Sequence, residues 1–219
     1  MRRLGVVTIG QSPRDDVVPE LRALLPKNVI VVETGALDGL SKEEIPPPQA
    51  PERTLVTRLS DGTELQVDKA FVHGRLEAAV RSLETRVDLI AYLCSGDLPE
   101  FPARVPILIP HRLLEGYLKA IRFPGPIGVL VPAPAQVKPA LEELESWGVP
   151  ALGQAVSPYS QASKVGEKAM QLANEGVVAI LLHCFGFSLA MREQAARASG
   201  LPVISVRSLL ARALCELLQ

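Results

Sequence analysis

Two apolar runs, each of which ends in a cysteine and a glycine-containing loop, constrain the fold of this chain more than any other feature. Residues 87–93 lead into Cys94, and residues 177–182 lead into His183 and Cys184. Continuous apolar runs of this length, bounded by turn residues, are typical of strands that are buried on both faces of a parallel sheet. In open α/β sheets, ligands bind beyond the carboxyl ends of the strands. Both thiols are therefore predicted to lie where such a sheet binds its ligand.

The order of the predicted elements repeats along the chain. A strand at residues 4–9 is followed by a loop and a helix, and the same order restarts with a strand at residues 127–130. Alternation of strands and helices favours parallel sheets. The sequence therefore predicts two related α/β lobes. The expected boundaries are 1–110 together with 206–219 for the first lobe, and 111–205 for the second.

The first half of the repeat contains an insertion. Cys94 lies 90 residues beyond the start of the strand at residue 4, whereas Cys184 lies 57 residues beyond the start of the strand at residue 127. The difference of 33 residues matches the segment at about 35–68, which contains 34 residues. Within it, Asp-Gly between two alternating runs predicts a β-hairpin at residues 54–67. We expect this hairpin to be an appendage outside the repeated unit.

Composition and charge limit the partners. The 219 residues suffice for one core or two small lobes. The 23 basic and 24 acidic side chains give a net charge of -1, and no basic stripe with interleaved aromatic residues is present, so nucleic acid is not expected as a partner. No run has membrane-spanning length and no signal peptide is recognisable, so no membrane partner and a cytoplasmic location are expected. Self-association into a homo-oligomer is left open.

Three cysteines without close pairing indicate thiols in a reducing compartment, and no metal-binding spacing is present. A small molecule is the expected partner.

A polar loop follows the first predicted strand. Thr8 lies near the end of the strand, and Gln11, Ser12 and Arg14 follow it. The next helix is expected to be capped by Asp15 or Asp16, because this start keeps Pro19 in the first turn. A guanidinium in such a loop can bind a ligand carboxylate. Arg14 is alternatively a solvated residue at the helix start, and both interpretations stay open.

Residues 7–16, Val-Thr-Ile-Gly-Gln-Ser-Pro-Arg-Asp-Asp, resemble the opening of the AroM family. The two cysteine loops and the segment 200–204 are similar to the hydantoin-racemase branch of the aspartate/glutamate/hydantoin racemase superfamily. The resemblance covers nearly the whole chain. It implies two pseudo-symmetric α/β lobes with mostly parallel sheets flanked by helices, a ligand cleft between the lobes, and a last helix that returns to the first lobe.

The resemblance also implies an activity and a set of site residues. A thiolate can remove a proton α to a carboxylate while a thiol on the opposite face returns one, so a racemase or epimerase of this kind needs no cofactor and no metal. The expected ligand is a small carboxylate or amino-acid-like compound. The predicted catalytic residues are Cys94 and Cys184. The predicted substrate-binding residues are Thr8, Gln11, Ser12, Arg14, Ser95, Gly96, Asp97, Phe185 and Gly186.

Two departures from the superfamily pattern keep other functions open. Residues 131–134, Val-Pro-Ala-Pro, stand where superfamily racemases usually carry hydroxyl or amide side chains. His183 replaces a small residue before the second cysteine, and it is either an acid or base in the reaction or a packed, hydrogen-bonded histidine. The alternative functions are a non-catalytic small-molecule-binding protein of the same fold, and a one-cysteine decarboxylase or lyase.

Four other residues have simpler interpretations. Cys215 is expected in the core, on the same side of the last helix as an apolar stripe. His73 and His111 lie at predicted helix starts, where capping and solvent contact explain them. Asp97 either binds a substrate nitrogen or caps the following turn. The leucines expected to form the stripe are Leu209, Leu210, Leu214 and Leu217.

Overall fold

The computed structural model describes residues 1–219 and divides into two compact units. One unit contains Met1–His111 and Leu210–Gln219, and the other contains Arg112–Leu209. Each unit is built on a four-stranded sheet in which all neighbouring strands are parallel. The predicted α/β class, with two parallel sheets flanked by helices, is confirmed. None of the helices combines the length and the apolar character needed to cross a bilayer.

The sheet of the first unit has its strands in an order that brings the first strand to the centre. Across the sheet the strands are β2 (Val29–Gly35), β1 (Arg2–Thr8), β5 (Leu89–Tyr92) and β6 (Ile107–Leu108). The helices of this unit are α1 (Val18–Leu24), α2 (Lys69–Leu83) and the short 3₁₀ helices η1 (Lys42–Glu44) and η2 (Pro51–Arg53). The unit boundaries fall inside α3 (Pro110–Lys119) and α7 (Val206–Leu217).

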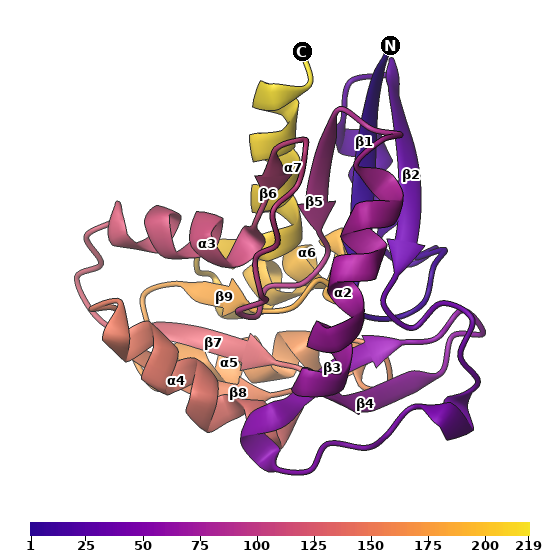
Figure 1. Ribbon diagram of the computed structural model, residues 1–219. Helices are drawn as coiled ribbons and strands as arrows, with labels where there is room; N and C mark the ends of the chain where they lie inside the picture. Colours follow the sequence, from indigo (N-terminus) through magenta and orange to yellow (C-terminus); the bar gives the residue numbers. More distant parts are fainter. The chain divides into compact units, whose positions relative to one another are not determined.

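Helix α2 covers one face of this sheet, along β1 and β2 (Figure 1). Asp68 caps its start by accepting hydrogen bonds from the N–H groups of Ala70 and Phe71. Close approach to β1 requires a glycine, since a Cβ at Gly5 would lie 3.0 Å from the Leu83 side chain. The helix therefore packs directly on the backbone of the central strand.

Helix α1 begins later than expected. It starts at Val18 because residues 15–17 form a turn, in which the N–H groups of Val17 and Val18 donate to the Arg14 carbonyl. The proline lies in the first helical turn, as predicted.

The predicted hairpin is present, and it forms a two-stranded sheet of its own. Strand β3 (Thr54–Arg58) pairs antiparallel with β4 (Glu64–Asp68). The turn between them is closed by the N–H of Leu59, which donates to the Thr63 carbonyl at 2.9 Å. The hairpin packs against the loop that follows β1, where the Gln11 N–H donates to the Arg58 carbonyl at 3.3 Å.

The second unit repeats the strand order of the first. Across its sheet the strands are β8 (Ala151–Ala155), β7 (Ile127–Val131), β9 (Ile180–Leu182) and β10 (Val203–Ser205). Its helices are α4 (Val137–Ser146), α5 (Val165–Asn174), α6 (Leu189–Ser199) and the short η3 (Pro134–Gln136) and η4 (Ala162–Lys164).

Helices α4 and α5 cover opposite faces of the second sheet. A Cβ at Gly128 would lie 3.0 Å from Leu172 of α5, and a Cβ at Gly153 would lie 3.4 Å from Leu141 of α4. Gly153 pairs with the residue next to Gly128, and successive strand residues point to opposite faces. The two glycines thus let a helix approach each side of the sheet.

The two sheets also agree in register. Val7 of β1 lies opposite Tyr92, the last residue of β5, and Leu130 of β7 lies opposite Leu182, the last residue of β9. Strands β5 and β9 are each followed two residues later by a cysteine. The predicted repeat therefore extends to the individual residue that delivers each thiol.

The apolar stripe predicted for α7 is wrong in part. Leu217 is 54% exposed, and Cys215 is partly exposed, with its thiol donating to the Leu24 carbonyl at 3.0 Å. The helical period places a different set of positions on one face, starting from Arg207 rather than Leu209. The residues of α7 and its end that are buried are Val206, Arg207, Leu210, Ala211, Leu214 and Leu218.

The packing of the hairpin on the β1 loop predicts that Gly10→Ala destabilises the protein. A Cβ at Gly10 would lie 2.3 Å from Thr57 Oγ1 and 2.5 Å from the Arg58 carbonyl oxygen, so the hairpin must shift. We expect the free energy of unfolding in urea to fall by roughly 1–3 kcal/mol. Gly74→Ala is the control, since no atom lies within 4 Å of its new Cβ in the middle of α2, and it should raise stability by about 0.5–1 kcal/mol. Equal stability of Gly10→Ala and the wild type would contradict this packing.

Candidate functional site

Each cysteine loop begins just after a backbone hydrogen bond that is equivalent in the two sheets. The N–H of Leu93 donates to the Val7 carbonyl at 2.8 Å, and the N–H of His183 donates to the Leu130 carbonyl at 3.0 Å. Each bond extends the ladder one residue beyond the strand. The cysteine is in each case the next residue, at the carboxyl edge of a parallel sheet, where ligands bind in this type of fold.

A backbone N–H of the Cys184 loop donates to the sulfur of Cys184 itself. The N–H of Gly186 donates to Cys184 Sγ at 3.3 Å, and the N–H of Phe187 donates to the Cys184 carbonyl at 3.3 Å. A donor directed at sulfur stabilises a thiolate more than a thiol. Only glycine fits at the turn, since a Cβ on Gly186 would lie 2.6 Å from Pro158 and 2.8 Å from Tyr159. The loop therefore directs a backbone N–H donor at the sulfur of Cys184, an arrangement that favours the thiolate form.

A fully buried arginine of α7, Arg207, donates hydrogen bonds to the Cys184 loop. Arg207 of α7 is 0% exposed, and its Nε donates to the Phe185 carbonyl at 3.1 Å while its Nη2 donates to the same oxygen. The hydroxyl oxygens of Ser205 and Ser208 on either side are buried and have no hydrogen-bond partner. The sequence interpretation missed Arg207. Its signal was a single charge in line with the apolar positions of the last helix.

His183 lies against helix α4. Its Nε2 is 3.8 Å from Glu143 Oε2, and its side chain is 10% exposed. Strand β9 ends at Leu182, so the alternation of side chains along a strand no longer fixes where His183 points. A carboxylate at this distance forms an ion pair only with a protonated imidazole. Both the acid or base role and the packing role of His183 stay predictions.

In the first unit, Arg14 is buried, and its guanidinium donates hydrogen bonds to neighbouring side chains. It is 3% exposed, so the interpretation as a solvated helix-start residue is wrong. Its Nε and Nη2 donate to the two carboxylate oxygens of Asp16 at 2.8 Å each, and its Nη1 donates to Thr8 Oγ1 at 2.9 Å. The Thr8 hydroxyl also accepts from the Gly10 N–H at 3.2 Å. A ligand carboxylate would have to share this guanidinium with Asp16.

Gln11 and Ser12 connect the β1 loop to the insertion. Gln11 Oε1 accepts from the N–H and Oγ of Ser60 at 2.9 and 3.0 Å, and Gln11 Nε2 donates to the Leu40 carbonyl at 2.7 Å. The N–H and Oγ of Ser12 donate to the carboxylate of Asp38 at 2.6 and 2.7 Å. These side chains therefore hold the insertion in place. Their ligand-binding role stays a prediction.

The loop of Cys94 lies next to the hairpin. Cys94 and Ser95 are buried, Gly96 is half-buried and Asp97 is exposed. A Cβ on Gly96 would lie 3.7 Å from Cys94 Sγ and 3.9 Å from the Leu55 side chain of β3. Cys94 belongs to the same apolar cluster as the inward-facing side chains of the hairpin. The insertion, which the sequence presented as an appendage, thus forms part of the surroundings of this thiol.

Helix α2 contains a histidine, His73, that the sequence interpretation explained by capping and solvent contact. His73 is the fifth residue of α2, and its Nε2 is buried without a hydrogen-bond partner. Burial lowers the pKa of His73 from its usual 6.5, and the charge of Lys69 lowers it further, while Asp97 and Asp68 act in the opposite direction. Asp97 of the Cys94 loop is thus one of the charges that act on the pKa of His73.

The fold defines a class of protein, the racemase-like α/β proteins. Allantoin racemase from Klebsiella pneumoniae has a TM-score of 0.67 and 16% identity over 99% of this chain and 89% of its own. Maleate isomerase Iso from Pseudomonas putida S16 has a TM-score of 0.68 and 15% identity over 99% and 92%. Unliganded arylmalonate decarboxylase has a TM-score of 0.64 and 12% identity over 100% and 93%. At these identities the likeness shows the fold.

Within this class, the chain belongs to the AroM family. The family model, described as AroM protein, matches residues 4–218. A comparison with curated proteins gave no match. The resemblance carried by residues 7–16 is thus confirmed. The solved structures show a fold shared with racemases and isomerases.

The contacts of Arg207 predict that Arg207→Met destabilises the protein. Methionine retains the aliphatic stem but removes both donors to the Phe185 carbonyl, and an unsatisfied buried acceptor costs roughly 1–3 kcal/mol. We expect a loss of that size in the free energy of unfolding in urea. Arg212→Met, at an exposed position of the same helix, should change stability by less than about 0.5 kcal/mol. Similar losses for both variants would argue against the role assigned to Arg207.

The environment of His73 predicts a dependence of stability on pH. Because the folded state lowers the pKa of His73, it favours the neutral imidazole. Above the unfolded pKa of 6.5 the imidazole is neutral in both states and costs the folded state nothing. As the pH falls below 6.5, the unfolded state takes up a proton more readily, and the free energy of unfolding decreases. The wild type should therefore lose stability relative to His73→Gln between pH 7 and pH 5. Chemical denaturation of both proteins at each pH measures the difference, which should be constant above pH 7.5. A difference that does not change with pH would contradict the burial of this imidazole.

Proposed function

We propose that this protein is a cofactor-independent isomerase that racemises or epimerises a small carboxylate or amino-acid-like compound. One observation carries the proposal: two sheets with the same strand order and register each deliver a cysteine two residues beyond the equivalent strand. In the proposed reaction, Cys94 and Cys184 act on opposite faces of one carbon. The mechanism requires that both thiols reach the same ligand.

The proposed chemistry needs one thiolate and one thiol. The thiolate removes the proton α to the carboxylate, and the electron pair of the broken C–H bond stays on the substrate as a delocalised carbanion. The thiol of the other cysteine then gives its proton to the opposite face of the same carbon. The two sulfurs end with their protonation states exchanged, so the reverse reaction restores the starting enzyme. The N–H of Gly186 at Cys184 Sγ supports the thiolate form on one side.

Ligand binding is proposed to use the loops around both cysteines. The names of the solved relatives describe racemases and isomerases of small molecules, such as allantoin and maleate, which supports a ligand of similar size. We propose a homologous position for the ligand, at the carboxyl edge of the sheets. The residues proposed to contact it are Thr8, Gln11, Ser12, Arg14, Ser95, Gly96, Asp97, Phe185 and Gly186.

An asymmetry between the two sheets favours a second candidate, a decarboxylation that uses Cys184 alone. Val131 occupies in β7 the position that Thr8 occupies in β1, since each carbonyl accepts from the first residue after the neighbouring strand. The second sheet therefore lacks a hydroxyl there. In this reaction the bond to a carboxylate breaks, CO₂ leaves, and the electron pair left on carbon takes the proton of the Cys184 thiol. The likeness to arylmalonate decarboxylase supports this candidate.

The first experiment is a thermal-shift screen of the purified protein with dicarboxylates, amino acids and hydantoins. A ligand at 100 times its Kd stabilises the folded protein by about 2.7 kcal/mol, which is a measurable shift. The ligand found is then incubated with the protein in D₂O, and deuterium at its α carbon is followed by NMR. Two-base isomerisation predicts that Cys94→Ala and Cys184→Ala each abolish turnover, because each removes one proton-transfer partner.

The control is Cys215→Ala, which makes the same change at a thiol that donates to the Leu24 carbonyl on α1. It should retain full turnover. Loss of turnover in Cys184→Ala alone selects the one-cysteine reaction. Undiminished deuterium incorporation in both cysteine variants rules out cysteine bases. Binding without any turnover of the wild type selects a non-catalytic ligand-binding protein.

A further inference from the structure

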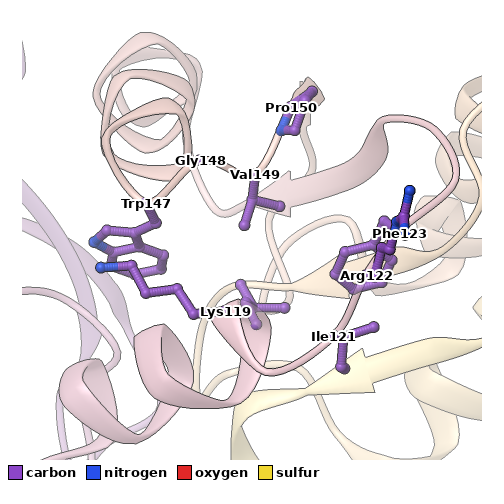
Figure 2. Close-up of a pocket in the computed structure, with 9 residues that line it drawn as sticks. Lys119, Ile121, Arg122, Phe123, Trp147, Gly148, Val149 and Pro150 are labelled. Carbon is purple, nitrogen blue, oxygen red and sulfur yellow. The ribbon is translucent and has the colours of Figure 1, made fainter.

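The second unit contains a cavity of about 280 Å³ away from its cysteine loop (Figure 2). Its lining comes from the end of α3, from the segment leading to β7, and from the turn between α4 and β8. These segments enter the sheet at the amino ends of β7 and β8. Cys184 follows the carboxyl end of β9, which runs parallel to β7. The cavity and the thiol therefore lie at opposite edges of one sheet.

The walls of the cavity are apolar and aromatic. Trp147, the only tryptophan of the chain, lies on one side, and Phe123 lies on the other (Figure 2). The other apolar side chains of the lining are Leu118, Ile121, Val149 and Pro150. An indole face favours stacking with a planar group, since offset-stacked aromatic pairs are worth about 0.5–1.5 kcal/mol beyond their buried area.

Two basic side chains lie at the cavity, and one of them has no carboxylate partner. Lys119 Nζ forms an ion pair with Glu115 at 2.6 Å, which offsets its charge. Arg122 lines the cavity from an exposed position and forms no ion pair. A planar guanidinium with its donors available is suited to bidentate binding of a carboxylate. The cavity thus combines an aromatic wall with an uncompensated positive charge.

We propose that this cavity binds a small planar organic anion, of the class of a single aromatic ring that carries one carboxylate. The ring lies against Trp147, and the carboxylate pairs with Arg122. The volume restricts the ligand to about one ring, because it lies just below the range for small-molecule pockets, roughly 300–1,000 Å³. This site is separate from the cysteine chemistry and does not depend on it.

The sole tryptophan gives a direct test. Benzoate is titrated into the full-length protein while Trp147 fluorescence is recorded, and the indole N–H signal is followed by ¹H–¹⁵N NMR. We expect saturable changes in both signals at low millimolar benzoate. Neutral benzamide should bind at least about tenfold more weakly, because it lacks the charge that Arg122 recognises. Equal binding of benzoate and benzamide would overturn the proposal.

Two variants locate the binding. Arg122→Gln should raise the Kd for benzoate at least about tenfold, whereas Lys138→Gln, the same charge change on the exposed face of α4, should leave it unchanged. Cys184→Ala should also leave it unchanged. Absence of a saturable signal up to 10 mM benzoate overturns the proposal, as does an unchanged Kd in Arg122→Gln. A loss of binding in Cys184→Ala would assign the signal to the cysteine loop instead.

Discussion

The backbone hydrogen bonds between a central parallel strand and its neighbour determine the rest of this architecture. The last of these bonds joins Leu93 to Val7 in one unit and His183 to Leu130 in the other. Each bond fixes the residue before a cysteine, so the thiol position is set by the main chain. The surroundings of the two sulfurs then differ, since the N–H of Gly186 donates to Cys184 Sγ whereas Cys94 lies in an apolar cluster. Equivalent backbone positions in the two sheets can therefore carry cysteines in two different chemical environments.

Elements with a local signal could be predicted from the sequence. The apolar runs predicted both cysteine strands, and Asp-Gly between alternating runs predicted the hairpin. The details that depend on contacts between distant residues could not be predicted. Asp38 has no pattern that links it to Ser12, and the pairing of Arg14 with its carboxylate depends on the turn that delays α1.

The last helix shows how side-chain character can mislead a prediction of burial. The leucines alone suggested one stripe, but the buried face passes through Arg207 and leaves Leu217 exposed. A buried charge is retained only where hydrogen bonds satisfy it. Here the bonds go to the carbonyl of Phe185, so the helix and the Cys184 loop are linked by a polar contact inside an apolar layer. The signal was present in the sequence, but its meaning required knowledge of the partner.

The polar contacts of the insertion have a consequence for any shortened version of this chain. Asp38 and Ser60 satisfy groups on the β1 loop, and Leu55 lies beside the Cys94 loop. Trimming the insertion to match the second half would leave those donors and acceptors exposed to water or to each other, and would uncover apolar side chains. The insertion is thus packed into the first unit and is not a peripheral addition to it. A shortened chain would therefore also need a redesigned loop after β1, to replace the hydrogen bonds that Ser12 and Gln11 make to the insertion.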